Sequence, residues 1–253
     1  MKKSVLFVFL VLALATMACS GLTISLGDND GRDNGVRIES SGEMQSETRE
    51  IGSFSRISFE SMGELNITQG DQISLTVEAD ENIMPRIITE VRNDTLFIEM
   101  ERGISLDIDQ PITFTLVVTD LNELALNGLG SVNLPELQTE ELVLEMNGAG
   151  GIEIGNLTAG RLEAMLDGLG SVELNGEVDE LTVSIPGSGN FDGENLRSRT
   201  ANVTISGLGS ANVWVVDNLQ VEISGAGSVD YYGSPSVQEE VNGLGRVNSR
   251  GDK

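Results

Sequence analysis

Apolar side chains recur at every second position in short segments throughout the second half of the chain. Around Gly207, for example, apolar residues stand at Val203 and Ile205 before the glycine and at Ala211 and Val213 after it. A period of two is typical of a β-strand with one buried face. The pattern therefore predicts a strand on each side of the glycine, with these residues pointing into a core.

This arrangement repeats with a pair of glycines in every copy. The motif Gly-x-Gly occurs seven times, at intervals of 18 to 20 residues, and its glycines are Gly128, Gly130, Gly148, Gly150, Gly168, Gly170, Gly187, Gly189, Gly207, Gly209, Gly225, Gly227, Gly243 and Gly245. A short fixed period is typical of a solenoid, in which each coil buries its apolar face against its neighbours. We predict an all-β fold, a single-stranded β-helix with Gly-x-Gly corners and seven such coils over residues 121–248.

The residue between the two glycines is out of step with both flanking strands. It is Leu129, Ala149, Leu169, Ser188, Leu208, Ala226 or Leu244. We expect a corner there, with the glycines supplying the tight bend and the middle side chain turning into the core. A third apolar column, Leu137, Leu157, Val178, Leu196 and Val216, predicts another short inward-facing segment in each coil.

Gly-x-Gly also occurs in phosphate-binding loops of dinucleotide-binding folds. That chemistry needs a helix directly after the glycines, because the amides of its first turn bind the pyrophosphate. The segment Ser131–Leu134 and its counterparts have the alternation of strands instead. The solenoid interpretation is therefore favoured.

The N-terminus has the pattern of an export signal. Two lysines precede an apolar run from Val5 to Ala15, and Ala18 stands directly before Cys19. Residues 1–18 resemble the signal peptide of a bacterial lipoprotein, which would place a lipid on Cys19; an ordinary cleaved signal is the alternative. We expect residues 19–46, rich in Gly, Ser, Asp and Asn, to form a flexible tether, and residues 47–253 to form the solenoid domain.

Composition narrows the possible functions. The chain has 15 basic and 40 acidic residues, a formal net charge of −25, no histidine and one cysteine. Such an acidic surface repels nucleic acid and anionic lipid. Without imidazole or a second thiol, the usual acid–base, nucleophilic and metal-ligating groups are missing, so we expect no cofactor and no enzyme activity.

An outward-facing row of polar residues is the first candidate site. Five positions after each first glycine, neighbouring coils place Glu153, Glu173 and Asp192 side by side. Like charges on adjacent strands repel, so the row either faces water or is relieved by a cation such as Ca²⁺. A pair of acids that hydrolyses a polysaccharide is a third interpretation, which would also need a substrate groove.

Two aromatic residues form the second candidate site. Trp214 and Tyr232 occupy equivalent outward positions on successive coils, so we expect them to be neighbours. Amphipathic rings placed in this way suit a sugar or protein ligand. Alternatively, they pack against the last residues and close the end of the rod, as a solenoid requires.

The segment before the coils resembles the head GIN domain family of adhesin-like proteins. The resemblance rests on Phe54–Ile57, Gly63–Asp71, Val77–Ile83 and Thr95–Ile98, together with the later Gly-x-Gly-Ser repeats, and covers residues 47–248. It implies a right-handed β-helix that is exported to a bacterial envelope. It brings no catalytic residues and no established ligand.

Together these features predict a non-enzymatic binding or adhesion module in the bacterial cell envelope, attached to the membrane through lipid on Cys19. Its partner would be an envelope protein or a glycan. The alternatives are a structural or stress-linked envelope lipoprotein that acts through protein contacts and, third, a β-helix enzyme that acts on polysaccharides.

Overall fold

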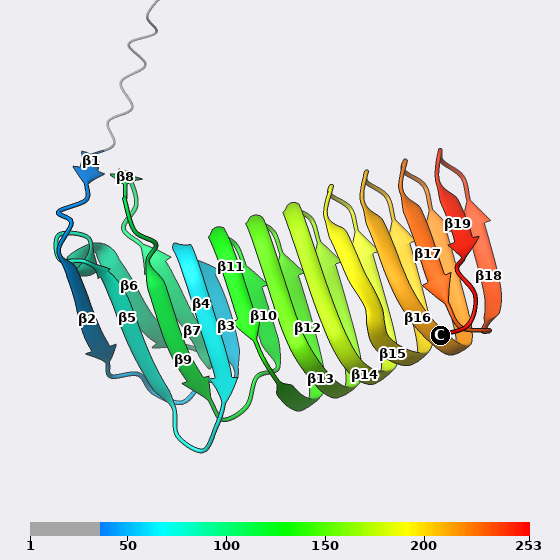
Figure 1. The fold of residues 1–253 in the computed structure, drawn as a ribbon, viewed down its shortest axis with the longest axis horizontal. Helices are drawn as coiled ribbons and strands as arrows, with labels where there is room; N and C mark the ends of the chain where they lie inside the picture. The colour runs from blue at the N-terminus through cyan, green and yellow to red at the C-terminus, as the bar shows by residue number, and fades with distance from the viewer. Residues whose placement is uncertain (1–35) are drawn as a thin grey trace, which may run out of the picture. The chain divides into compact units, whose positions relative to one another are not determined.

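In a computed structural model of the chain, residues 36–253 are described. They form a rod of β-strands, apart from one 3₁₀ turn, η1 (Met84–Arg86) (Figure 1). Within this range no helix is long and apolar enough to cross a membrane. The prediction of an all-β solenoid is confirmed.

The strands fall into an N-terminal group and a coil group. The N-terminal group comprises β1 (Val36–Glu39), β2 (Met44–Arg49), β3 (Arg56–Glu60), β4 (Met62–Gln69), β5 (Ser74–Asp80), β6 (Ile87–Arg92), β7 (Thr95–Met100), β8 (Ile104–Asp107) and β9 (Thr113–Val118). The coil group comprises β10 (Glu123–Leu126), β11 (Leu129–Leu134), β12 (Leu137–Met146), β13 (Ala149–Leu166), β14 (Leu169–Ile185), β15 (Asn190–Ile205), β16 (Ser210–Ile223), β17 (Ser228–Tyr232), β18 (Ser236–Val241) and β19 (Arg246–Ser249).

Parallel pairing holds successive coils in register. Leu144 pairs with Ala164, Ala164 with Val183, and Val183 with Val203, one coil at a time. Each of these side chains is buried, and Ile205, two residues further along, is 0% exposed. The inward columns predicted from the alternation are thus the core of the rod, because every coil covers the apolar face of the one before it.

The N-terminal group closes one end of the rod with antiparallel strands. β5 pairs antiparallel with β2 and β9, and β6 pairs antiparallel with β7. β3 and β4 then pair in parallel with β10 and β11, which joins this cap to the first coil. Phe59 and Phe114 meet edge to face in its core, with ring centroids 5.4 Å apart. The cap protects the first apolar coil from solvent.

The middle residues of the Gly-x-Gly turns do not enter the core, so that prediction is wrong. Leu129, Leu169, Leu208 and Leu244 are 60%, 65%, 70% and 89% exposed. The turn glycines lie directly against the preceding coil: the second glycine of each of the last four turns meets one of its inward side chains, and the other turn glycines meet its backbone. A Cβ added to Gly209, for instance, would lie 2.5 Å from the Ile185 side chain. The middle residue is therefore directed outward.

Two other expectations need correction. The predicted third column is two columns: Leu157 and Leu196 both pair with Gly176, whereas Val178 pairs with Ser198 and Ser198 with buried Val215. Val216 is only partly buried, because the β15–β16 register shifts between Gly193 and Arg197 and again beyond Ser198. The predicted end of the tether at residue 46 is too late, since β1 and the start of β2 lie inside residues 19–46. Ile38 of β1 packs against the core, and this apolar contact explains why the folded part begins earlier. Residues 1–35, with Cys19, lie outside the described part.

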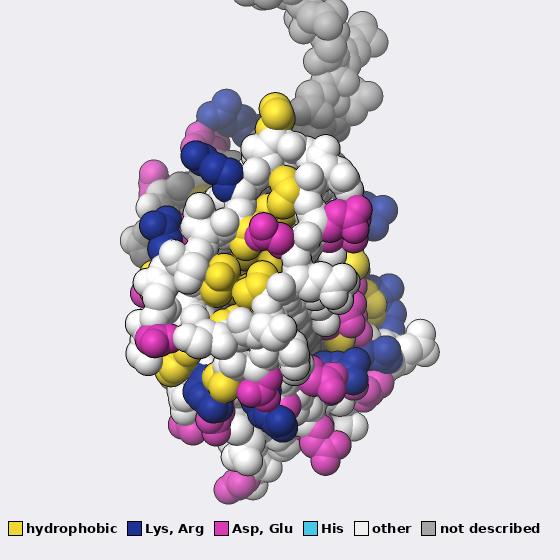
Figure 2. Space-filling model, turned by 90° about the vertical axis from the view of Figure 1, so that its right-hand side faces the viewer, with side chains coloured by type: hydrophobic (Ala, Val, Ile, Leu, Met, Phe, Trp, Pro, Cys, Tyr) yellow, Lys and Arg dark blue, Asp and Glu magenta, His cyan; other side chains and the backbone are white. Residues whose placement is uncertain are grey.

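The last coil carries an acidic residue in a core column. Glu239 of β18 pairs with Val221 of β16, which is buried. The inward positions on either side of Glu239 are apolar: Val237 pairs with Leu219, and Val241 pairs with Ile223. Viewed from this end, the rod shows apolar side chains at its centre surrounded by polar and charged ones (Figure 2). A charge at an inward position disfavours pairing of an exposed strand edge with another chain. Glu239 thus protects this end of the rod.

Candidate functional site

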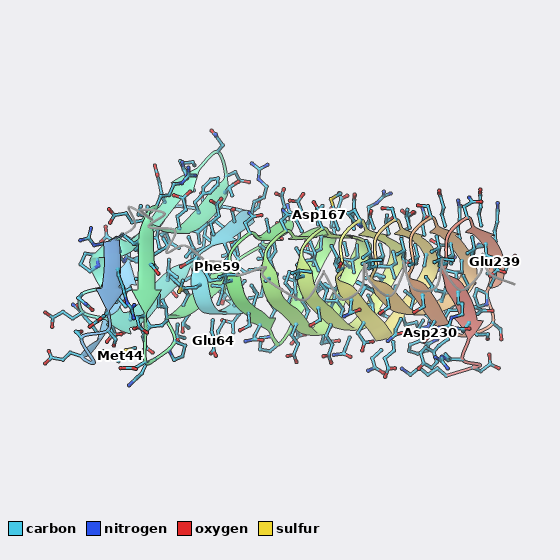
Figure 3. The ribbon with its side chains drawn as sticks, turned by 90° about the horizontal axis from the view of Figure 1, so that it is seen from above. Met44, Phe59, Glu64, Asp167, Asp230 and Glu239 are labelled. Carbon is cyan, nitrogen blue, oxygen red and sulfur yellow. The ribbon has the colours of Figure 1, made fainter. Side chains whose placement is uncertain are left out.

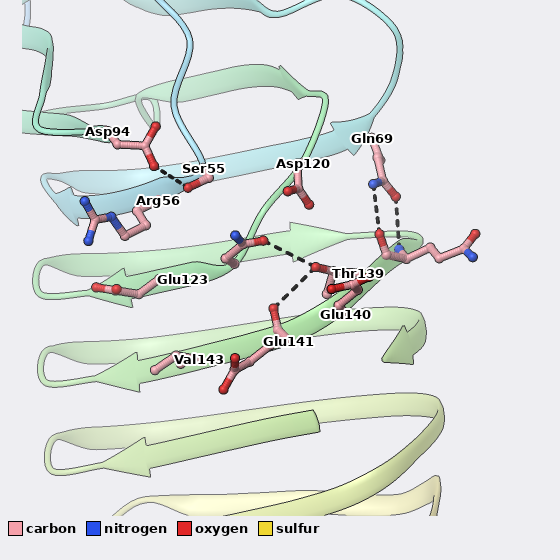
Figure 4. A pocket seen from close by; sticks show the side chains of 12 residues that line it. Ser55, Arg56, Gln69, Asp94, Asp120, Glu123, Thr139, Glu140, Glu141 and Val143 are labelled. Carbon is pink, nitrogen blue, oxygen red and sulfur yellow. Dashed lines mark hydrogen bonds between the residues drawn. The ribbon is translucent and has the colours of Figure 1, made fainter. Parts of the chain in front are cut away.

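A polar hollow lies beside the junction of the cap and the coils (Figure 4). Its volume is about 1150 Å³. It is lined by Ser55, Arg56, Gln69, Asp94, Asp120, Asn122, Glu123, Gln138, Thr139, Glu140, Glu141 and Val143. The hollow exists because β12 pairs with β10 only from Val143 to Met146, while Leu137 to Leu142 have a strand neighbour only in β13.

A side chain covers part of this open strand edge. The Gln69 amide donates to the Gln138 carbonyl at 3.0 Å, and the Gln138 backbone N–H donates to Gln69 Oε1 at 3.0 Å. Nearby, the Thr139 hydroxyl donates to the Glu141 carbonyl at 3.3 Å. These bonds satisfy backbone groups that a further strand would otherwise have bound. The wall is therefore built from ordered side chains.

The hollow is acidic and polar. Asp94, Asp120, Glu123, Glu140 and Glu141 line it, and the guanidinium of Arg56 is the single basic group among its lining residues. Asn93 and Asp94 form the β6–β7 turn with φ of 50° and 65°, a conformation that Asn and Asp tolerate. The Asp94 carboxylate accepts a hydrogen bond from the Ser55 hydroxyl, which fixes its direction.

Sequence reasoning missed this hollow. Its residues come from β3 and the residue before it, β4, the β6–β7 turn, the β9–β10 loop, β10 and β12, and no motif links these segments. They meet only because the strand neighbour of β12 is missing over half its length. One signal was present in the sequence. In the first repeat Asn122 occupies an inward position at which later coils carry Leu142 or Leu162, which indicates that the first coil is incomplete there.

The predicted acidic row forms in register. Glu153 pairs with Glu173, and Glu173 with Asp192, so the three carboxylates lie on successive strands. Across residues 36–253, however, no group of three or more His, Cys, Asp or Glu side chains is close enough to hold a metal ion. Glu153, Glu173 and Asp192 are therefore adjacent carboxylates on successive strands along one face of the rod.

The same row ends in a bonded cluster. Asp230 accepts hydrogen bonds from Asn248 at 2.8 Å and from Arg250 at 2.7 Å. Partial burial tends to raise the pKa of Asp230, but the bonds from these two side chains outweigh it and hold the pKa below its ordinary value. Asp230 is therefore a structural contact of the last coil.

The aromatic pair is where the sequence predicts it, and the last residue covers it. Trp214 pairs with Tyr232 across β16 and β17. The Lys253 ammonium lies 5.8 Å from the Trp214 ring centre and 5.0 Å from that of Tyr232. The Tyr232 hydroxyl donates to Glu194 at 3.2 Å, and this bond to a carboxylate raises the pKa of Tyr232. These contacts favour the end-closing interpretation over a free ligand platform.

Replacing Trp214 with alanine distinguishes the two roles of the pair. We expect a lower melting temperature, because the variant loses ring packing and the cation–π contact with Lys253, which together contribute about 2 kcal/mol. Differential scanning calorimetry measures this loss. If the melting temperature is unchanged and ligand binding is abolished, the pair is a recognition platform instead.

Comparisons with known proteins identify a family and a fold. The family model described as "Putative auto-transporter adhesin, head GIN domain" matches residues 53–235. No curated protein matches the chain.

Several solved structures match over most of the chain. A "putative adhesin" from Bacteroides fragilis is 24% identical, with a TM-score of 0.80, and the match covers 84% of this chain and 99% of that one. A "putative adhesin" from Parabacteroides merdae is 22% identical, with a TM-score of 0.68 and coverage of 85% and 99%. A "putative lipid binding protein" from Parabacteroides distasonis is 24% identical, with a TM-score of 0.63 and coverage of 84% and 99%. At these identities the likeness establishes the fold.

Proposed function

Because this chain belongs to the head GIN domain family, whose description is that of an adhesin, we propose that it is a non-enzymatic binding module of the bacterial cell envelope. The solved structures it resembles are described as adhesins or as a lipid-binding protein, and none is named as an enzyme. Its ligand is an envelope protein or a glycan.

The observation that carries this proposal is the hollow between the cap and β12. Its volume of about 1150 Å³ is ample for several sugar units or a short peptide segment, since ligand sites commonly measure about 300–1,000 Å³. Hydroxyl, amide and carboxylate groups line it, and these bind polar ligands through hydrogen bonds. Its carboxylates favour a neutral or basic partner over an acidic one.

Filling the hollow should abolish binding without unfolding the protein. Thr139 is partly exposed and lies on the wall, so Thr139→Trp places a large ring in the hollow without changing the core. We expect retention on a glycan array, or capture of the envelope partner, to fall at least about tenfold, the loss that removing a main contact typically causes. The melting temperature should stay close to that of the unaltered chain.

A matched substitution elsewhere controls for the added ring. Thr204 is also partly exposed but lies on β15 and lines none of the described hollows. Thr204→Trp should leave binding intact. If Thr139→Trp and Thr204→Trp bind as the unaltered chain does, the ligand site is not in the hollow.

We further propose that lipid on Cys19 anchors the module, since an apolar export signal ends directly before this residue. Cys19→Ser removes the only thiol available for lipidation, so most of the protein should move from the detergent phase to the aqueous phase. Detergent phase separation of whole cells measures this partition. Equal partition of the variant and the unaltered chain would contradict the anchor but would not bear on the hollow.

A further inference from the structure

A row of mostly apolar side chains, four of them exposed leucines, follows one edge of the rod. It consists of the middle residues of the seven Gly-x-Gly turns together with Met62, which pairs with Leu129. We call this row the ridge: Met62, Leu129, Ala149, Leu169, Ser188, Leu208, Ala226 and Leu244. Figure 3 views the rod from this edge. Four leucines that are 60–89% exposed in a strongly acidic chain need an explanation.

The members of the ridge are held in line by backbone hydrogen bonds between coils. Leu129 pairs with Ala149, and Ala149 with Leu169. Further along, the Leu208 N–H bonds to the Gly187 carbonyl at 2.9 Å, and the Leu244 N–H to the Gly225 carbonyl at 2.9 Å. The ridge is therefore a rigid line with one residue in each coil.

Side-chain size alternates along this line. From Leu129 to Leu244 the order is Leu, Ala, Leu, Ser, Leu, Ala, Leu. Because coils are spaced by about 4.8 Å, the leucines stand about 9.6 Å apart with a small residue between them. A gap of this width admits one side chain from a facing surface, and that surface must have the same spacing. A second copy of the rod provides it.

We propose that two copies of this chain associate side by side and antiparallel through their ridges. A two-fold axis between Leu169 and Ser188 makes this interface isologous, with the same surface used on both copies. Every ridge leucine between the ends then faces a small residue of the partner. The facing pairs are Leu169 with Ser188, Ala149 with Leu208, Leu129 with Ala226 and, at the ends, Met62 with Leu244.

Charges beside the ridge fit the same arrangement. Two residues after each ridge member stand Glu64, Ser131, Gly151, Ser171, Asn190, Ser210, Ser228 and Arg246. This flank starts with an acid, ends with a base and carries no charge between them. Glu64 and Arg246 are exposed, and neither has an ion-pair partner among residues 36–253. In the antiparallel dimer each Glu64 faces Arg246 of the second copy.

The opposite flank introduces no repulsion. Two residues before the ridge members, Asp167 would face Pro186 of the second copy, and Glu60 would face Asn242. A parallel, in-register pair would instead place leucine on leucine and Glu64 opposite Glu60 of the second copy. The ridge is only about 34 Å long and narrow, which corresponds to the low end of interface sizes. Association should therefore be weak, and confinement to a membrane would favour it.

Disulfide trapping tests the geometry in the full chain. Cells co-express two differently tagged copies, one with Leu129→Cys and one with Ala226→Cys, and mild oxidation is followed by mass spectrometry of the linked peptides. We expect linkage between positions 129 and 226, because these residues face each other in the dimer. Each variant expressed alone is the control, since its own cysteines would be five coils, or about 24 Å, apart.

The outcomes are distinct. Linkage of 129 to 226 that exceeds linkage of 129 to 129 at least about tenfold supports the antiparallel dimer. Equal linkage in the single-variant control indicates a parallel arrangement and overturns the proposal. No linkage above that of the unaltered chain, whose Cys19 sets the background, overturns it as well.

Charge reversal provides an independent measurement. Arg246→Glu and Glu64→Arg should each reduce the linked fraction roughly fivefold, the effect expected of replacing two exposed ion pairs by like charges. The double variant restores the pairs with their signs exchanged, so linkage should return to within about twofold. Arg161→Glu, on another face of the rod, controls for net charge. If the double variant is as weak as either single one, Glu64 and Arg246 do not meet.

Discussion

Ile205→Asp is expected to lower the free energy of unfolding by at least about 4 kcal/mol, close to the whole stability of a typical domain. Ile205 is 0% exposed, and its strand neighbours Ile185 and Ile223 are also fully buried. Its neighbours in the column are apolar, so the carboxylate would be buried in an apolar stack. Urea unfolding followed by circular dichroism measures the loss.

The adjacent position provides the control. Thr204 is partly exposed and pairs with Ser184 and Glu222 on the outer face. Thr204→Asp adds one charge beside Glu222, which costs no more than about 1 kcal/mol. A similar loss of stability in both variants would mean that inward and outward positions on β15 have been assigned incorrectly.

Most of the rod could be predicted because its core follows a simple rule. Along a strand the side chains alternate between two faces, so the columns that contain Ile205 and Val203 can be read directly from the chain. The coils repeat this pattern at a nearly constant interval, which also placed Glu153 beside Glu173 and Trp214 beside Tyr232. Prediction succeeded wherever local alternation and the repeat agreed.

Prediction failed where the alternation is interrupted. At the Gly-x-Gly turns an apolar residue was assigned to the core because it is apolar, yet Leu169 and Leu208 face solvent. The turn glycines lie directly against the side chains or the backbone of the preceding coil, and sequence alone does not reveal how closely two coils approach. At Val216 a shift of register moved the inward position to Val215. Hydrophobicity without a known register does not determine the face of a residue.

The cap and its hollow depend on contacts between distant segments. Gln69 and Gln138 are separated by 69 residues and belong to no shared motif, although they form two hydrogen bonds. The antiparallel pairs of β5 with β2 and β9 likewise join strands that no repeat relates. Such pairings are selected by the packing of the whole cap, so a single sequence gives little indication of them.

Gly168→Ala should destabilise the rod by about 3 kcal/mol, the upper range for forcing an extra group into a packed site. A Cβ at Gly168 would lie 2.0 Å from the carbonyl oxygen of Gly148 in the preceding coil. That contact is with backbone, which cannot rotate away as a side chain can. The coils would have to separate there, weakening the bonds from the Gly168 and Leu169 N–H groups to Met146 and Gly148.

Gly151→Ala is the control for Gly168→Ala, because it also replaces a glycine but at a position where the added methyl group has room. A Cβ added to Gly151 would lie 3.7 Å from the nearest atom, the carbonyl oxygen of Ser171, which is an ordinary contact. The adjacent coils carry Ser131 and Ser171 at the same position, so a side chain is accommodated there. Gly151→Ala should therefore leave stability unchanged or raise it by up to about 1 kcal/mol, because alanine restricts the unfolded chain. Thermal unfolding of both variants measures the difference. If Gly168→Ala melts at the same temperature as Gly151→Ala, neighbouring coils are not held in contact at the first glycine of each turn.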